Sequence, residues 1–99
     1  MKTKTNKQKT IAMHAEGHRV DAAWADARAE LAACEAKLSR DLATYAATGS
    51  AEDLTLCRSR FEDCKDARMS EAAAIIEFDT HHFTMRLAQI GADHAAADE

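Results

Sequence analysis

The sequence contains no proline, only three glycines, and aromatic residues at only 5% of its 99 positions. Proline and glycine are the residues that most strongly interrupt helices, so their scarcity leaves little to break a helical chain. No stretch approaches the roughly 18 consecutive apolar residues of a transmembrane helix. The basic N-terminus lacks an apolar segment, so we expect no secretory signal and a cytoplasmic location with reduced thiols.

Motifs typical of catalytic sites are also missing from the chain. It has no phosphate-binding glycine loop, no dinucleotide-binding fingerprint and no glycine-rich oxyanion loop. The three cysteines show no Cys-x-x-Cys spacing, which argues against a zinc site of the finger or ribbon type. We therefore predict a protein that is not an enzyme and that carries no cofactor.

Alanine dominates what is present. Apolar residues make up 46% of the chain, but 23 of them are alanine. Alanine is the best helix former, yet its methyl group buries little area. At about 25 cal/mol per Å² of apolar surface, the few large side chains stabilise a two-helix structure only marginally. We therefore expect the chain to associate with itself or with another protein.

Gly49-Ser50 divides the chain into two apolar-periodic segments of nearly equal length. Glycine readily adopts the left-handed conformation that ends a helix, and serine is a favoured cap for the next one. The spacing predicts an all-α, antiparallel two-helix hairpin with helices at about 10–48 and 51–90 and a turn at 48–50. A break at Gly17, giving three shorter helices, is the alternative.

Both ends of the chain are expected to lie outside this hairpin domain of residues 10–91. Residues 1–9 are polar and basic and predict a flexible arm. Gly91 predicts the end of the second helix. The alanine-rich segment 92–99 is expected to fray.

Apolar residues alternate at spacings of three and four along both segments, as in coiled coils. The antiparallel register predicts that Cys34 faces Cys64 and that Trp24 faces Ile75 or Ile76. Six large side chains are expected in the seams, or in the interface of a homodimer that closes into a four-helix bundle. They are Trp24, Leu31, Leu38, Phe61, Ile76 and Phe83.

Charge is unevenly distributed along the chain. Four lysines and no acid lie within residues 1–9, whereas the rest holds 17 acids against the other 9 of the 13 bases. The lysines Lys2, Lys4, Lys7 and Lys9 are candidates for contacts with a nucleic-acid backbone. A candidate interaction face on the second helix comprises Glu52, Asp53, Glu62, Asp63, Asp66 and Glu71. Spaced carboxylates of this kind either imitate a phosphate backbone or form an ordinary solvated face.

Cysteine and histidine provide the remaining candidates for chemistry. Cys34, Cys57 and Cys64 either form a redox latch or soft-metal site, or act as small core residues, and their heptad spacing favours the core. His14 and His18 lie one helical turn apart, and the register brings His82 to the same end of the hairpin. These three histidines are a weak metal-site candidate, and the prediction is that no metal is bound.

These patterns favour a small helical module that acts by binding a protein partner and that forms a homodimer without contacting a membrane. One alternative is an acidic inhibitor of a nucleic-acid-binding machine, of the kind that phages and mobile elements use against host defence. The other is a small nucleic-acid-binding regulator that uses the lysine arm.

Overall fold

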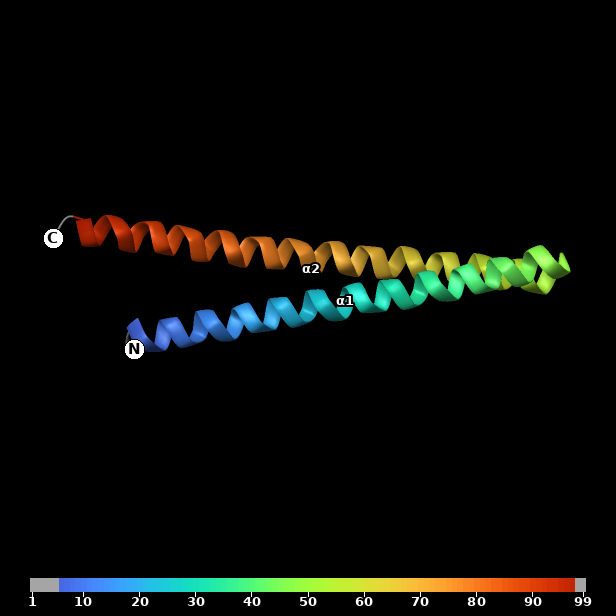
Figure 1. Ribbon diagram of the computed structural model, residues 1–99, viewed down its shortest axis with the longest axis horizontal. Coiled ribbons are helices and arrows are strands. Elements are labelled where there is room, and N and C mark those ends of the chain that lie inside the picture. The colour runs from blue at the N-terminus through green and yellow to red at the C-terminus, as the bar shows by residue number, and fades with distance from the viewer. Residues whose placement is uncertain (1–5, 98–99) are drawn as a thin grey trace.

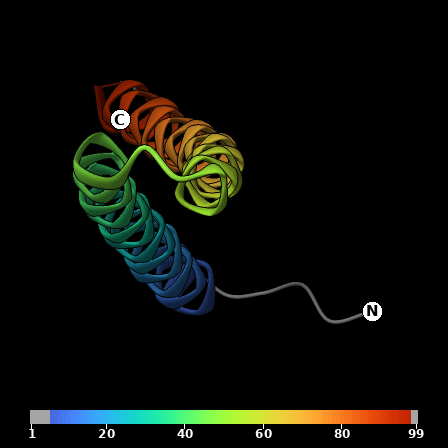
Figure 2. The ribbon, with the colours of Figure 1, turned by 90° about the vertical axis from the view of Figure 1, so that its right-hand side faces the viewer.

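A computed structural model describes residues 6–97, with side chains from residue 7 onward. Helix α1 comprises Asn6–Thr48 and helix α2 comprises Ala51–Ala97, and the two run antiparallel along a rod about 74 Å long (Figure 1). Seen end-on, the axes of the two helices are inclined to each other (Figure 2). The predicted all-α hairpin is confirmed. Neither helix combines the length and apolarity needed to span a membrane.

The turn between the helices is built as its residues predict. Gly49 has φ of 63°, and its N–H donates to the Tyr45 carbonyl at 2.7 Å, which closes α1. Ser50 caps α2, because its hydroxyl oxygen accepts a hydrogen bond from the Asp53 N–H at 3.1 Å. The Asp53 carboxylate in turn accepts hydrogen bonds from the hydroxyls of Ser50 and Thr48. Two short polar residues and one acid therefore hold the reversal together.

Small residues line the face of α2 that meets α1. The buried side chains of this face are Cys57, Cys64 and Ala67, and α1 contributes the fully buried Val20. Larger side chains pack beside them, and the Trp24 and Phe78 rings lie 4.8 Å apart between their centroids. The Trp24 indole N–H is buried without an acceptor in the described part of the chain. Small side chains on one helix allow the backbones to approach closely, so this narrow core depends on shape more than on buried area.

Ion pairs cross between the helices along the whole hairpin. Near the turn, Arg60 Nε of α2 lies 2.9 Å from Asp41 Oδ2 of α1, and this is the least exposed pair. Towards the open end, Arg19 bridges Glu16 on its own helix and Glu77 of α2, the latter at 3.1 Å. These pairs join positions at similar distances from the turn, so they support the antiparallel register from the Asp41–Arg60 pair to the Arg19–Glu77 pair.

The seam on α1 is where the sequence places it, but the seam on α2 is not. Trp24, Leu31 and Leu38 lie partly buried between the helices. In contrast, Phe61, Ile76 and Phe83 are 47%, 66% and 62% exposed, so none of the three is buried in the seam as predicted, although Phe61 borders a groove between the helices. The Trp24 ring lies against Phe78 of α2, and the predicted neighbour Ile75 is partly buried whereas Ile76 is exposed. Whether the three exposed residues lie in a dimer interface stays a prediction.

The helix ends extend beyond the predicted boundaries. Helix α1 begins at Asn6, so residues 6–9 of the predicted flexible arm are helical, and residues 1–5 lie outside the described part. Helix α2 runs through Gly91 to Ala97, so the predicted end at Gly91 is wrong. Gly91 costs only about 1 kcal/mol relative to alanine, which flanking helix formers offset.

Gly17 lies within an unbroken α1, which rules out the three-helix alternative. An added Cβ at this position would lie 3.1 Å from His81 Nε2 of α2, so the glycine accommodates a close side chain from the opposite helix.

Alanine substitutions at the two glycines are expected to affect stability to different extents. Gly49→Ala should lower the free energy of unfolding by about 1–2 kcal/mol, because alanine is strained at positive φ. Gly17→Ala should change it by less than about 1 kcal/mol, because higher helix propensity offsets a small shift of the flexible His81 side chain. Urea unfolding at one fixed protein concentration measures both, and equal losses would contradict the assignment of the turn.

The turn also predicts an acid-dependent loss of stability. Hydrogen bonds from Thr48 and Ser50 hold the pKa of Asp53 below its usual range. Its contribution is therefore present above the unfolded pKa of about 3.9 and is lost as the pH falls through the lower folded value. Thermal melts across this range should show a smaller loss for Asp53→Asn than for the wild type. Glu52→Gln is the matched control, and an unchanged pH dependence for Asp53→Asn would contradict the prediction.

Candidate interaction surfaces

A row of large apolar side chains runs along the side of α2 that faces away from α1. We call it the outer stripe, and its members are Met69, Ile76, Phe83, Leu87 and Ile90. Their exposed fractions lie between 46% and 72%. Four of the five are spaced by seven residues, which keeps them on one side of the helix. The outer stripe is thus a row of exposed apolar side chains along one side of a long helix.

A second apolar surface lies near the turn. Leu42 and Phe61 are about half exposed there, and they border a groove of about 420 Å³ between the two helices. Its lining residues are Leu38, Leu42, Leu54, Cys57, Arg58, Phe61 and Glu62. This groove is shorter than the outer stripe and lies on a different part of the surface.

The predicted acidic face does not form one surface with free carboxylates. Asp53 is engaged in the helix cap, and Glu62 lies 3.2 Å from Lys65. Asp63 lies 3.9 Å from Arg60, which itself pairs with Asp41. Of the remaining members, Glu71 is only partly exposed, whereas Glu52 and Asp66 are exposed. Local ion pairs therefore reduce the charge that this face presents.

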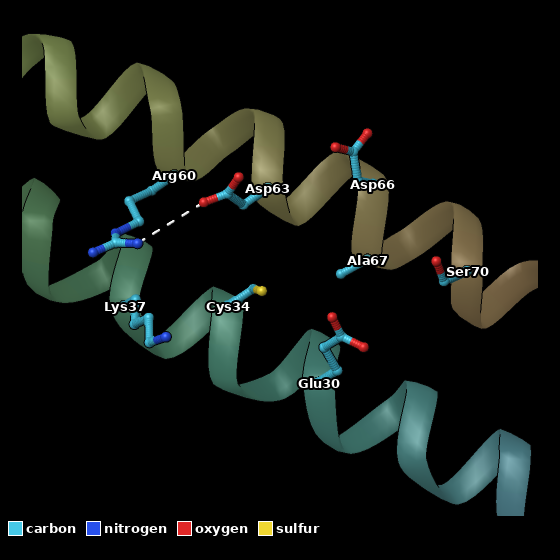
Figure 3. A pocket seen from close by; sticks show the side chains of 8 residues that line it. All are labelled: Glu30, Cys34, Lys37, Arg60, Asp63, Asp66, Ala67 and Ser70. Carbon is cyan, nitrogen blue, oxygen red and sulfur yellow. Dashed lines mark ion pairs between the residues drawn. The ribbon is translucent and has the colours of Figure 1, made fainter.

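A shallow hollow of about 290 Å³ between the helices contains several of these groups (Figure 3). Its lining residues are Glu30, Cys34, Lys37, Arg60, Asp63, Asp66, Ala67 and Ser70. The close-up shows the Cys34 thiol at its centre, between charged side chains from both helices (Figure 3). The bases Lys37 and Arg60 lie together at one end of the hollow and the three acids lie along the rest of its rim (Figure 3), so the hollow presents no single charge to a ligand.

The cysteines lie mainly in the core, with all three thiols free. Cys57 and Cys64 are buried and Cys34 is partly exposed. Burial raises the pKa of the Cys64 thiol, and the nearby Cys34 contributes further. A raised pKa makes the reactive thiolate rarer, so Cys64 is better suited to packing than to redox chemistry.

The histidines do not assemble into a metal site. His82 stacks on Phe78 and lies 3.7 Å from Asp21, while His14 borders a separate hollow beside Met13 and Met85. No group of three or more possible ligands is brought together within residues 6–97. The weak candidate set of His14, His18 and His82 is thus dispersed over the open end of the hairpin.

The lysine arm is only partly described. Lys7 and Lys9 are exposed on the first turns of α1, whereas Lys2 and Lys4 lie outside the described residues. The role of all four in nucleic-acid binding stays a prediction.

The outer stripe is the feature that the seam prediction missed. Apolar periodicity assigned the large side chains of α2 to the face that meets α1 and did not consider two apolar faces on one helix. The available signal was the seven-residue spacing of Met69, Ile76, Phe83 and Ile90, in a different phase from Cys57, Cys64 and Ala67. Because alanine and cysteine are small, a search for large apolar residues at helical spacing does not detect the face on which they lie.

Thiol reactivity should separate the three cysteines. In the folded protein, iodoacetamide at mildly alkaline pH should modify Cys34 first, with Cys57 and Cys64 protected by burial. Peptide mass spectrometry over time gives the order, and the same reaction in urea is the control for intrinsic reactivity. Equal rates at the three positions in the folded protein would contradict the packing.

Comparisons with protein-family models, with curated proteins and with solved structures found no match to this chain.

Proposed function

We propose that this chain is a non-enzymatic helical module that binds a protein partner through the outer stripe of α2. The observation that carries the proposal is the continuous exposure of five large apolar side chains on one helix face. Single exposed apolar residues are common on protein surfaces, but a contiguous apolar patch marks an interaction site. Leaving these large apolar side chains in contact with water is unfavourable in free energy, and binding of a partner would bury them.

The spacing of the outer stripe indicates the shape of the partner surface. Apolar residues repeated every seven positions present a straight seam to another helix, into which its side chains interdigitate. Polar and charged residues such as Glu77, Asp79 and Arg86 flank the seam, as the rim of an interface does. Burying one large apolar side chain contributes roughly 1.5–3 kcal/mol, so a helix covering the whole stripe has ample driving force. A helical partner therefore fits this surface best.

Competing surfaces provide weaker support. The hollow around Cys34 is shallow and lined by charges of both signs, and the acidic residues of α2 are partly neutralised by neighbouring bases. Neither offers a continuous patch of one character.

The proposal is tested by a tagged pull-down from host lysate with nuclease present, read by quantitative mass spectrometry. The baits are the wild type, Ile76→Asp in the outer stripe, and Ala29→Asp, which adds the same charge at an exposed position of α1. We expect a stoichiometric protein partner that is reduced at least tenfold with Ile76→Asp and retained with Ala29→Asp, because a buried unpaired charge is costly.

Partner capture that is unaffected by Ile76→Asp would contradict the outer stripe as the binding surface. A partner that disappears on nuclease treatment would instead indicate nucleic-acid binding through the lysine arm.

A further inference from the structure

We infer that the helix that covers the outer stripe is α2 of a second copy of this chain, packed antiparallel to the first. This inference rests on the proposed function, because it names the occupant of the same surface. Three features of α2 carry it: a coiled-coil seam, the alternation of large and small residues along that seam, and two opposite charges on either side of its middle.

The outer stripe belongs to a longer seam with regular spacing. Met69, Ile76, Phe83 and Ile90 occur at every seventh position, and an exposed residue follows each of them four positions later. These following residues are Ala73, Thr80, Leu87 and His94. Alternating steps of four and three define the core positions of a coiled coil. At 1.5 Å per residue the seam is roughly 38 Å long, enough for several layers of side chains.

Residue size along the seam favours pairing with an antiparallel copy. In the register that centres the two-fold axis between Thr80 and Phe83, Phe83 packs against Thr80 of the second copy. Ile90 then packs against Ala73 of the second copy, so a large side chain meets a small one in each of these layers. A parallel pair would stack Phe83 on Phe83 and Thr80 on Thr80, which alternately overfills and underfills the core.

The remaining layers of this register are apolar or amphipathic. Ile76 meets Leu87 of the second copy, and Met69 meets His94 near the ends of the seam. Because the axis is two-fold, each of these contacts occurs twice, which doubles the area covered by one short set of residues.

Charge complementarity selects the same register. Asp79 and Arg86 lie on one edge of the seam, both are exposed, and neither makes an ion pair within residues 6–97. They are seven residues apart in one chain, roughly 10.5 Å along the helix, and so are too far apart to pair with each other. In the antiparallel register Asp79 lies beside Arg86 of the second copy, and symmetry repeats the pair. A parallel register leaves both charges without an opposite partner.

The arrangement leaves the hairpin itself unchanged. The inner face of α2 stays packed on α1 through Cys64, Ala67 and Phe78, while the opposite face meets the second copy. The two α2 helices form the middle of the assembly, and the two α1 helices flank them. The turns then lie at opposite ends of a four-helix rod.

Light scattering after size exclusion gives the first test. The wild type should have twice the mass of one chain at micromolar concentration, and Ile76→Asp should have the mass of one chain. Ala29→Asp, which adds the same charge on α1, should stay dimeric. Far-ultraviolet circular dichroism checks that all three remain helical, since both substituted positions are exposed and outside the hairpin seam. A wild type that is monomeric at every concentration would overturn the inference.

Charge reversal tests the antiparallel register. Asp79→Arg places two arginines against each other twice, and Arg86→Asp does the same with two aspartates, so each variant should dimerise about tenfold more weakly than the wild type. The double variant Asp79→Arg/Arg86→Asp should recover wild-type affinity, and mixing the two single variants should produce a one-to-one heterodimer. Single reversals with unchanged affinity, or a mixture that stays monomeric, would overturn the antiparallel pairing.

The outcomes separate this inference from the proposed function. A monomeric wild type whose captured partner is still lost with Ile76→Asp overturns self-pairing and leaves the proposed function standing. A dimer that dissociates with Ile76→Asp supports self-pairing even when the pull-down captures no other protein. In that case the second copy is the partner of the outer stripe, and the foreign partner is contradicted.

Discussion

The reversal of the chain at Gly49 decides which side chains of the two helices face each other. The left-handed Gly49 and the capping Ser50 are the only two residues between α1 and α2. This short connection brings positions at equal distances from the turn opposite each other. The ion pairs of Arg60 with Asp41 and of Arg19 with Glu77 lie at opposite ends of the hairpin and obey this register. Packing, ion pairs and the direction of the outer stripe all follow from that constraint.

Helix α2 has two apolar faces, and the most buried residues of the inner face are small, although Phe78 and the partly buried Ile75 and Met85 also lie on it. The inner face has Cys57, Cys64 and Ala67 against α1, where small groups allow close approach. The outer face has larger residues that find no cover within one hairpin. A two-helix protein has only one interface of its own, so large side chains on the second face have no intramolecular partner. The outer face is therefore the surface that we propose a partner covers.

Charged residues show a similar division. Some lie at the edges of the inner seam and pair across it, as Arg19 does with Glu77, or pair with a neighbour on the same helix, as Lys65 does with Glu62. Others flank the outer stripe, and Asp79 and Arg86 are among them. Exposed pairs contribute little stability each, so their value lies in selecting register and partner orientation. Asp79 and Arg86 therefore lie beside the surface that we propose to be an interface, without an ion pair within residues 6–97.

The sequence by itself determined the helical class, the position of the turn, the serine cap and the apolar seam of α1. These are local properties: helix propensity, the positive φ of Gly49, and a periodicity whose largest residues, such as Trp24 and Leu31, do face α2. Which of the two heptad phases on α2 meets α1 followed from the tertiary packing alone, because both phases are apolar and each contains large residues, such as Phe78 in the inner phase and Phe83 in the outer one. The continuation of α2 past Gly91 and the division of the acidic residues among caps and ion pairs also emerged from the structure. Both depend on contacts with neighbouring residues, which an analysis of apolar periodicity does not include.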